Sequence, residues 1–217
     1  MTEQKKRGRP RKPDKPKTYD PTKIKYLTPE QLEKLWKAMN GNKRDRAMFR
    51  LCYAFGLRVA ELVSLKLEDI FWESQQIRIA RVKSGVPRVW DIPDKLFKLL
   101  KQWVKEREKL DNAKDNPYLF ITEYSGKSKP IDRNTVQWMF RYYVKKAGIG
   151  DWNSYSVHSL RHSLGVHLAS DPAVPLEYIK QRLGHKSILS TQIYMDLVGR
   201  ERKEIDRKIE QNGTLRI

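Results

Sequence analysis

Histidine, arginine and tyrosine side chains in the C-terminal third of the chain form a pattern suited to phosphate chemistry. Residues 158–162 read HSLRH, which places His158 and Arg161 three positions apart and therefore on neighbouring positions of one helical face. An imidazole and a guanidinium in that arrangement can grip one phosphate group. Farther along, His185, in a Leu-Gly-His tripeptide, precedes Tyr194 by nine positions.

A second arginine, upstream, has a carboxylate beside it. Residues 56–62 read GLRVAEL, so Arg58 stands at a predicted helix start with Glu61 three positions later. Attack on a phosphodiester builds negative charge on its non-bridging oxygens, and Arg58 and Arg161 offer planar, permanently charged groups to bind them. A phenol with an ordinary pKa of about 10 needs nearby cations and a basic imidazole to ionise at neutral pH. These residue types suit the binding of a phosphate group.

A mainly helical domain is predicted around these residues. A capping-box pattern from Thr28 to Gln31 begins a helix that continues to about Asn40. Further helices are predicted from about Lys43 to Gly56, as a short segment near Arg58, from Asp94, from the Asp132 cap to Gly148, and at about 158–170, 175–183 and 187–195. Period-two alternation between Gln75 and Ile92 predicts one β-hairpin, with residues 83–86 between its strands. The expected fold is mainly α with a small antiparallel β-sheet, and no boundary divides residues 27–200.

Composition and charge limit the classes of partner. The chain has 217 residues and a mass of 25.7 kDa, 39% of its residues are apolar, and 45 Lys and Arg against 26 Asp and Glu give a net charge of +19 and a pI near 9.9. Such a charge favours a polyanion, with nucleic acid as the first candidate. No apolar run reaches the ~18 residues of a membrane span and no signal peptide is evident, so we expect a soluble cytoplasmic protein. The single cysteine, Cys52, excludes an internal disulfide and is predicted to be buried.

Residues 1–26 are predicted to form a basic arm. Residues 1–25 hold ten Lys or Arg against three acids and too few apolar side chains to fold alone. Residues 7–10 read RGRP, which resembles the core of an AT-hook, a motif that inserts arginines into the minor groove of A·T-rich DNA. The candidate DNA-binding residues of the arm are Arg7, Arg9, Arg11 and Lys12. A solvated basic tail, attracted diffusely to phosphates, is an equally open interpretation.

Taken in order, these motifs resemble those of the tyrosine recombinases, or phage integrase family, which includes the Xer proteins and the fimbrial invertases. The family pattern is an Arg in a Gly-x-Arg-x-x-Glu-Leu setting, a hairpin Lys, His-x-x-Arg-His, Leu-Gly-His and a nucleophilic Tyr, and each has a counterpart here. The resemblance covers roughly residues 27–200 and implies the family's catalytic-domain fold. It leaves residues 201–217 as a C-terminal tail.

The resemblance implies a role for each matched residue. Tyr194 is the nucleophile that attacks a backbone phosphate, which leaves a 3′-phosphotyrosyl enzyme and a free 5′-hydroxyl. Arg58 and Arg161 bind the phosphate oxygens, and His158 is the candidate base. Because a phosphotyrosyl bond conserves the energy of the broken diester, no nucleotide, metal or other cofactor is expected.

Three further residues complete the implied site. His185 donates a hydrogen bond to the scissile phosphate, Lys83 at the hairpin tip protonates the leaving 5′-oxygen, and Glu61 orients its neighbours from behind. Arg81 and Arg88 lie close to Lys83 in the sequence and are the alternatives to it.

The remaining histidines are interpreted as structural. His158 and His162 are four positions apart, but Ser159 stands where a metalloprotease motif has Glu, so a zinc site is not expected. We interpret His162 and His167 as structural side chains.

Other aromatic and basic residues have two interpretations each. Tyr155 and Tyr178 are candidates for packing, since Tyr194 alone has the interval from His185. Arg182, Lys186 and the basic residues of the 132–146 helix form either a phosphate-facing surface or a solvated charged face.

The resemblance favours a site-specific DNA recombinase, an integrase or an invertase, of prokaryotic or viral origin. A type IB-like topoisomerase, which rejoins the same strand, and a non-catalytic DNA-binding protein on the same fold are the alternatives. Family members act as tetramers on two duplexes, so we expect double-stranded DNA as partner, a homotetramer on paired sites, a monomer without DNA, and no membrane contact. Typical members carry a helical DNA-clamping domain ahead of the catalytic one, whereas this chain has a 26-residue arm. We therefore expect the arm, contacts between protomers or an accessory DNA-bending protein to hold the duplex.

The C-terminal segment has two possible packing arrangements. Val198, Ile205 and Ile209 give residues 196–217 a thin apolar stripe. The segment either packs on its own chain or exchanges between protomers.

Overall fold

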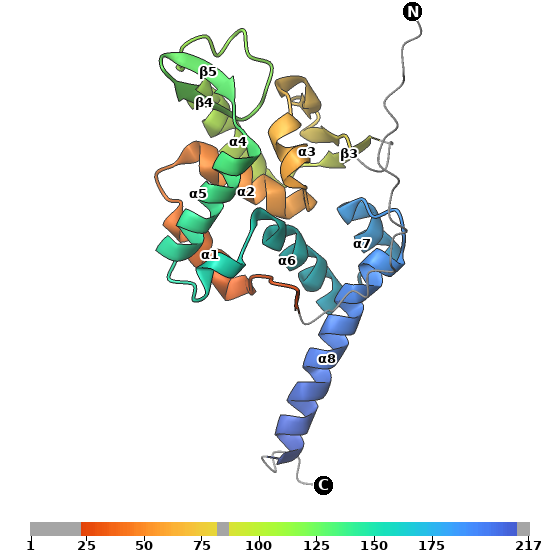
Figure 1. The fold of residues 1–217 in the computed structure, drawn as a ribbon. Coiled ribbons are helices and arrows are strands. Elements are labelled where there is room, and N and C mark those ends of the chain that lie inside the picture. Colours follow the sequence, from red (N-terminus) through yellow and green to blue (C-terminus); the bar gives the residue numbers. More distant parts are fainter. Residues whose placement is uncertain (1–22, 82–86, 212–217) are drawn as a thin grey trace, which may run out of the picture.

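Helices form most of the body (Figure 1). The computed structural model describes residues 23–81 and 87–211. The helices are α1 Pro29–Ala38, α2 Lys43–Phe55, α3 Val59–Ser64, α4 Asp94–Arg107, α5 Arg133–Lys146, α6 Val157–Ser170, α7 Leu176–Leu183 and α8 Leu189–Gln211, with short 3₁₀ segments η2 Leu67–Asp69 and η3 Trp152–Ser154. The strands are β1 Ile70–Phe71, β2 Gln76–Ile79, β3 Arg88–Asp91, β4 Ile121–Tyr124 and β5 Lys127–Pro130. The predicted helix starts and the mainly helical class are confirmed.

The predicted β-hairpin is present as part of a three-stranded antiparallel sheet. Strand β2 pairs with β1 on one side and with β3 on the other, with Ile77 opposite Trp90. Ile77 and Ile79 are buried, which agrees with the alternation in the sequence. Residues 82–86, which include Lys83, lie outside the described residues.

A second sheet, β4 paired with β5, contradicts the prediction of one sheet only. Ser125 and Gly126 join the strands with positive φ angles of 52° and 68°, the geometry of a tight two-residue hairpin turn. Strand β5 reads KSKP and is mostly exposed, so it lacks the apolar alternation that marked the first hairpin. The Ser-Gly pair was the only local signal of this turn.

Helix α2 lies at the centre of the core, packed on α4 and α6. Its side chains Met48, Phe49, Leu51, Cys52 and Phe55 are fully buried. Burial of each large apolar side chain contributes roughly 1.5–3 kcal/mol to folding. Burial also raises the pKa of the Cys52 thiol to about 12, which makes it an inert core residue as predicted.

Helix α8 is longer than predicted. The sequence pattern indicated a helix over 187–195, but α8 continues to Gln211 and its C-terminal half extends away from the body (Figure 1). The first half of α8 packs on α6 and α7. Farther along α8, Glu201 accepts a 2.6 Å hydrogen bond from the hydroxyl of Tyr26, and Arg202 donates to the Ser170 carbonyl at 3.2 Å. Residue 200, the predicted end of the catalytic domain, therefore lies inside a continuous helix. Within residues 23–81 and 87–211, no helix is both long and apolar enough to cross a membrane.

Replacing the cap of α5 provides a first test of the fold. Asp132 accepts hydrogen bonds from the backbone N–H groups of Asn134 at 2.8 Å and Thr135 at 3.0 Å. We expect Asp132→Ala to lower the free energy of unfolding by about 1 kcal/mol, because two N–H groups at the helix start lose their partner. Urea denaturation measures the change, with Asp115→Ala, an exposed acid in a turn, as the control. Equal stability of the two variants would contradict the assigned cap.

Candidate active site

Glu61 fixes Arg58 at the start of α3. Gly56 ends α2 with a φ of 56°, and a Cβ there would lie 2.6 Å from a methyl of Leu183, so glycine permits the tight turn that leads to Arg58. Glu61 is buried and accepts a backbone N–H and a guanidinium N–H from Arg58, both at 2.9 Å. Burial raises the pKa of Glu61, but the hydrogen bonds from Arg58 and the charge of Arg81 outweigh it and hold that pKa below its ordinary value. Glu61 is therefore an ionised anchor for Arg58.

Arg81 connects Glu61 to two backbone carbonyls next to the site. Its guanidinium donates to Glu61 at 2.8 Å, to the Phe55 carbonyl at 2.9 Å and to the Arg182 carbonyl at 2.5 Å. A Cβ on Gly184 would lie 2.7 Å from its Nε, so only glycine fits at that point. These contacts tie the end of α2, the start of α3 and the end of α7 together. Arg81, one of the two alternatives to Lys83 considered from the sequence, is thus a buried support of the site.

Arg161 enters the same region from α6. Its side chain is 1% exposed, and its Nη1 donates to the Gly56 carbonyl at 2.6 Å, beside the turn that carries Arg58. Its Nη2 is buried and has no hydrogen-bond partner among the described residues. Burial and the nearby charge of Arg58 lower the pKa of Arg161 to about 10, so it is a cation at neutral pH. A buried cation with an uncommitted N–H suits an anionic group.

Tyr194 lies between α6 and the turn that follows α7. Its side chain is 1% exposed, and its ring is parallel to that of His185 with centroids 6.3 Å apart. A hydrogen bond of 3.0 Å joins its hydroxyl to Nδ1 of His162. The ring packs directly on Gly165, where a Cβ would lie 2.6 Å from Cζ of Tyr194. His185 is held in turn by a 2.8 Å hydrogen bond between its Nδ1 and the hydroxyl of Thr191.

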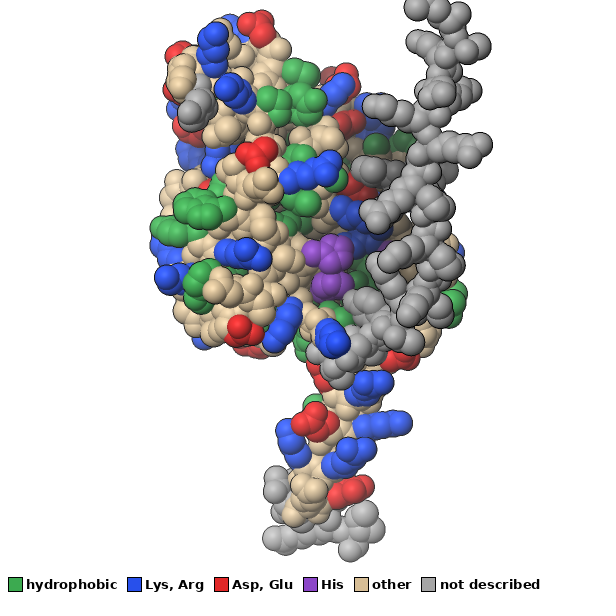
Figure 2. Space-filling view, in the orientation of Figure 1, with side chains coloured by type: hydrophobic (Ala, Val, Ile, Leu, Met, Phe, Trp, Pro, Cys, Tyr) green, Lys and Arg blue, Asp and Glu red, His purple; other side chains and the backbone are tan. Residues whose placement is uncertain are grey.

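A cavity of about 410 Å³ brings three histidines and Tyr194 together, while Arg58 and Arg161 are not part of its lining. It is lined by His158, His162, His185, Leu189, Ser190, Ile193 and Tyr194. Figure 2 shows the histidine side chains gathered on one face of the body beside Lys and Arg side chains. In the part of the chain that the structure describes, no cluster of three or more His, Cys, Asp or Glu is arranged to hold a metal.

The histidines of this cavity are neutral at pH 7. Removal from water and the positive charges of Arg161 and Arg58 lower the pKa of His158 to about 4. Burial, together with His158 and Arg161, lowers the pKa of His162 to about 3, and burial with Arg161 and Arg58 lowers that of His185 to about 3. A neutral imidazole offers one N–H donor and one lone pair, which suits both hydrogen bonding and proton transfer.

His162, interpreted from the sequence as a structural residue, bonds the hydroxyl of Tyr194. Its position one helical turn after His158 was the available signal for a shared face. Arg182 is half-buried, because its guanidinium carbon stacks 4.5 Å from the ring centroid of Phe55 and 4.6 Å from that of Trp90.

The other predicted residues are distributed as follows. His167 bonds the hydroxyl of Tyr53 at 2.9 Å. Tyr178 is exposed and lies edge-on to Trp90. Lys186 is exposed, in a cavity of about 220 Å³ next to His185. Lys83, Arg7, Arg9, Arg11 and Lys12 lie outside the described residues.

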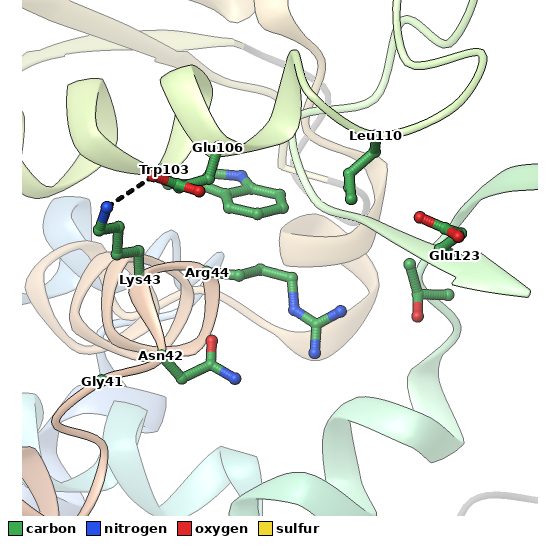
Figure 3. Close-up of a pocket in the computed structure, with 9 residues that line it drawn as sticks. Gly41, Asn42, Lys43, Arg44, Trp103, Glu106, Leu110 and Glu123 are labelled. Atoms are coloured by element: carbon green, nitrogen blue, oxygen red, sulfur yellow. Dashed lines mark hydrogen bonds and ion pairs between the residues drawn. The ribbon is translucent and has the colours of Figure 1, made fainter.

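A separate cavity of about 460 Å³ lies between the start of α2, α4 and β4 (Figure 3). Lys43 and Glu106 at its edge form an ion pair of 2.6 Å, and Arg44 donates to the Ile121 carbonyl at 3.3 Å. None of the residues predicted to carry chemistry lines it. The chemistry is therefore assigned to the histidine-lined cavity.

Comparison with known proteins decides the family. Residues 25–200 match the Phage integrase family. The chain belongs to that family. The chain is 34% identical over 195 residues to the tyrosine recombinase XerA of Pyrococcus furiosus, covering 89% of this chain and 63% of that protein. It is 31% identical over 186 residues to the tyrosine recombinase XerD of Vibrio vulnificus, covering 83% and 59%.

Solved structures of phage integrase family members share the fold. A crystal structure of XerA recombinase aligns with a TM-score of 0.69 and 29% identity, over 84% of this chain and 65% of that one. The XerH site-specific recombinase, bound to its palindromic difH substrate after cleavage, aligns with a TM-score of 0.69 and 25% identity, over 84% and 52%. The expected tyrosine recombinase catalytic-domain fold is confirmed. The chain spans about three fifths of the length of the relatives it matches.

Proposed function

We propose that this chain is a site-specific DNA recombinase, an integrase or an invertase, that cleaves and rejoins DNA through a 3′-phosphotyrosyl intermediate. The observation that carries the proposal is the proximity of Arg161 on α6, His185 in the turn after α7 and Tyr194 on α8. Arg161 and Arg58 meet at the Gly56 turn, and His185 lies parallel to the ring of Tyr194. Membership of the phage integrase family supports the same reaction.

The phosphate is bound by charge. The guanidinium groups of Arg58 and Arg161 bind the non-bridging oxygens of the scissile diester, where negative charge grows in the transition state. Glu61 holds Arg58 in place, and His185 donates a further hydrogen bond to the phosphate. The uncommitted Nη2 of Arg161 supports this assignment.

The reaction is a transesterification. The oxygen of Tyr194 attacks phosphorus, the bond to the 5′-oxygen breaks, and the released 5′-hydroxyl later reverses the step on the same or another strand. As the family resemblance implies, His158 is proposed to be the base that accepts the proton of Tyr194. Lys83 is proposed to protonate the leaving 5′-oxygen. Because Arg58 and Arg161 supply the positive charge, the proposed reaction uses no metal and no nucleotide.

Double-stranded DNA is the proposed partner. The net charge of +19 favours it. A cavity of about 220 Å³ beside His185 is lined by Arg88, Lys180 and Lys186, which we propose to contact flanking phosphates, and also by Glu177, which pairs with Lys180 at 3.2 Å. Arg7, Arg9, Arg11 and Lys12 are proposed to add contacts from the basic arm. An accessory DNA-bending protein is a further proposed partner.

The proposed assembly is a homotetramer on paired DNA sites and a monomer without DNA. Residues 203–208 of α8 are exposed, Ile205 among them at 56%. We propose that this exposed half of α8 reaches the neighbouring protomer once DNA brings protomers together. We also propose a cytoplasmic location, where the chain would meet its DNA substrate.

Covalent capture tests the proposed function. The full chain is incubated with nicked DNA duplexes of randomised core sequence, in EDTA and without nucleotide, and detergent-resistant protein–DNA adducts are isolated and sequenced. We expect adducts attached through a 3′-phosphate. Transfer of the captured strand to a second duplex indicates a recombinase, whereas rejoining confined to the original strand indicates the topoisomerase alternative. Absence of adducts, or adducts that require a divalent metal, would contradict the proposal.

Gly165 supplies a prediction about the nucleophile. In Gly165→Ala the new methyl would lie 2.6–2.8 Å from three ring carbons of Tyr194, so the ring must move. We expect cleavage to slow by about 10-fold or more, because misplacement by 1 Å can cost about 100-fold. Gly199→Ala is the control, since nothing lies within 4 Å of the Cβ it would add on α8. An unchanged cleavage rate in Gly165→Ala would contradict the claim that Tyr194 reacts from its observed position against Gly165.

A further inference from the structure

Arg81 is a buried arginine that shares a carboxylate with one of the proposed phosphate-binding residues. Its side chain is 4% exposed and lies two positions after the end of β2. Nη1 of Arg81 donates to Oε2 of Glu61 at 2.8 Å, while Oε1 of the same carboxylate accepts from Nη1 of Arg58 at 2.9 Å. Glu61 therefore joins two arginines, of which Arg58 is the one proposed to bind the scissile phosphate.

The same guanidinium also contacts the turn that carries His185. Nη2 of Arg81 donates to the Phe55 carbonyl at 2.9 Å and to the Arg182 carbonyl at 2.5 Å. Its Cγ, Cδ and Nε lie 3.0, 2.8 and 2.7 Å from the point where a Cβ would stand on Gly184, so the side chain packs directly against that backbone. His185 is the next residue in the chain. Arg81 thereby links the end of α2 to the backbone immediately before His185.

We propose that Arg81 is a positioning residue that sets the spacing between Arg58, at the start of α3, and His185, in the turn after α7. This inference rests on the proposed function, in which both residues bind the scissile phosphate. Arg81 acts through the Glu61 carboxylate on one side and through the Arg182 carbonyl on the other. A planar guanidinium suits this role, because its fork of N–H groups can serve a carboxylate and two carbonyls at once.

The positive charge of Arg81 has a second effect, on the ionisation of Glu61. Burial raises the pKa of Glu61, but the hydrogen bonds from Arg58 and the charge of Arg81 outweigh it and hold that pKa below its ordinary value. Without Arg81, burial is opposed mainly by Arg58, and we expect the pKa of Glu61 to rise. A protonated Glu61 is neutral and holds Arg58 less firmly.

The neighbours of Glu61 allow this effect to be observed as a pH dependence. The described charged or titratable groups that interact with Glu61 come from α2, the start of α3, the segment after β2 and α6, and they are Cys52, Arg58, Arg81, His158 and Arg161. Burial places the pKa of Cys52 at about 12, and burial with nearby arginines places that of His158 at about 4 and that of Arg161 at about 10. These three groups keep their charge between pH 5 and 8. We therefore assign to Glu61 any loss of activity toward pH 5 that appears only when Arg81 is changed.

Three variants separate the positioning role from the effect on charge. Arg81→Met fills similar space without a charge or an N–H group. Arg81→Lys keeps the charge, but its single ammonium lacks the planar fork that serves the carboxylate and both carbonyls together. The double variant Arg81→Met/Glu61→Gln removes both members of the buried pair, so no unpaired charge is left to prevent folding. Arg107→Met is the matched control, because Arg107 is also a buried arginine bonded to backbone carbonyls.

The test is the single-turnover rate constant of adduct formation at saturating DNA from pH 5 to 8, on a nicked duplex of the captured sequence, relative to wild type at each pH. Unfolding lowers the fraction of protein that reacts, whereas misplacement lowers the rate constant of the fraction that does. We expect Arg81→Lys to be about 10-fold slower than wild type at every pH, since misplacement by 1 Å can cost about 100-fold.

Arg81→Met should be about 10-fold slower than wild type at pH 8 and at least about 10-fold slower again at pH 5, where Glu61 takes up a proton. The double variant should be slow by the same factor at every pH, because Gln at position 61 does not titrate. Arg107→Met should show the wild-type rate constant throughout, with any loss confined to the reacting fraction.

Three results would overturn the inference. A wild-type rate constant in Arg81→Lys would show that the planar guanidinium positions nothing. A deficit of Arg81→Met that is the same at pH 5 and pH 8, or a loss toward pH 5 in the double variant, would contradict the effect on Glu61. If neither wild type nor Arg107→Met forms adducts, the proposed function is itself wrong, which separates its failure from that of the inference.

Discussion

Tyr194→Phe is expected to abolish covalent attachment to DNA while leaving DNA binding nearly intact. The variant lacks the oxygen that attacks phosphorus, and loss of a catalytic nucleophile lowers rates by about 10⁴-fold or more. The ring still packs on Gly165 and lies parallel to His185, so the fold is kept. Loss of the hydrogen bond to His162 costs about 1 kcal/mol of stability.

Tyr178→Phe is the matched control for that experiment. Tyr178 is an exposed tyrosine on α7. The Tyr178→Phe variant should form adducts at the wild-type rate on the same nicked duplex. Adducts in Tyr194→Phe at a comparable rate would mean that another residue attacks the phosphate.

Arg161→Ala is expected to lower the cleavage rate by about 10³-fold, the upper part of the range for removal of one preorganised donor to a transition-state oxygen. Arg161→Lys keeps the charge but not the planar fork, and its rate should lie between those of Arg161→Ala and wild type. Nη1 of Arg161 donates to the Gly56 carbonyl, whereas its Nη2 is available to bind the substrate phosphate. The proposed role therefore requires both nitrogens of a guanidinium and not the positive charge alone. Single-turnover cleavage at saturating DNA measures both variants.

Arg107 provides the comparison that separates chemistry from folding. It is buried to a similar degree, at 2% exposure, but its guanidinium is committed to the carbonyls of Ala113, Asn116 and Tyr118. Arg107→Lys should therefore lower the free energy of unfolding by about 1–3 kcal/mol and leave the cleavage rate of the folded protein unchanged. Equal cleavage by Arg161→Ala and Arg107→Lys would contradict a phosphate-binding role for Arg161.

Local signals predicted much of the fold. The capping residues Thr28 and Asp132 mark the starts of α1 and α5, and the glycine that ends α2 marks the turn before Arg58. These features depend on residues a few positions apart, so the sequence displays them directly. The end of α8 was missed because Gly199 weakens the helical pattern, while an exposed Glu204–Lys208 ion pair one turn apart supports the continued helix.

Contacts between distant residues could not be read from the sequence. The bond from Arg81 to the Arg182 carbonyl spans 101 positions, and the bond from His162 to Tyr194 spans 32. Motif order predicted Arg58, Arg161, His185 and Tyr194 as site residues, but only the packing of α6 against α8 shows which histidine bonds the phenol. For the same reason, Arg182 has the sequence context of a surface residue and is instead stacked on aromatic rings.

The identity of the residue joined to DNA tests the central claim most directly. Adducts of the wild-type chain are digested with protease and nuclease, and the peptide that carries a nucleotide is sequenced by mass spectrometry. We predict a single site, Tyr194, linked to a 3′-phosphate. Attachment at Tyr155, Tyr178 or any other residue, or linkage to a 5′-phosphate, would contradict the proposed site.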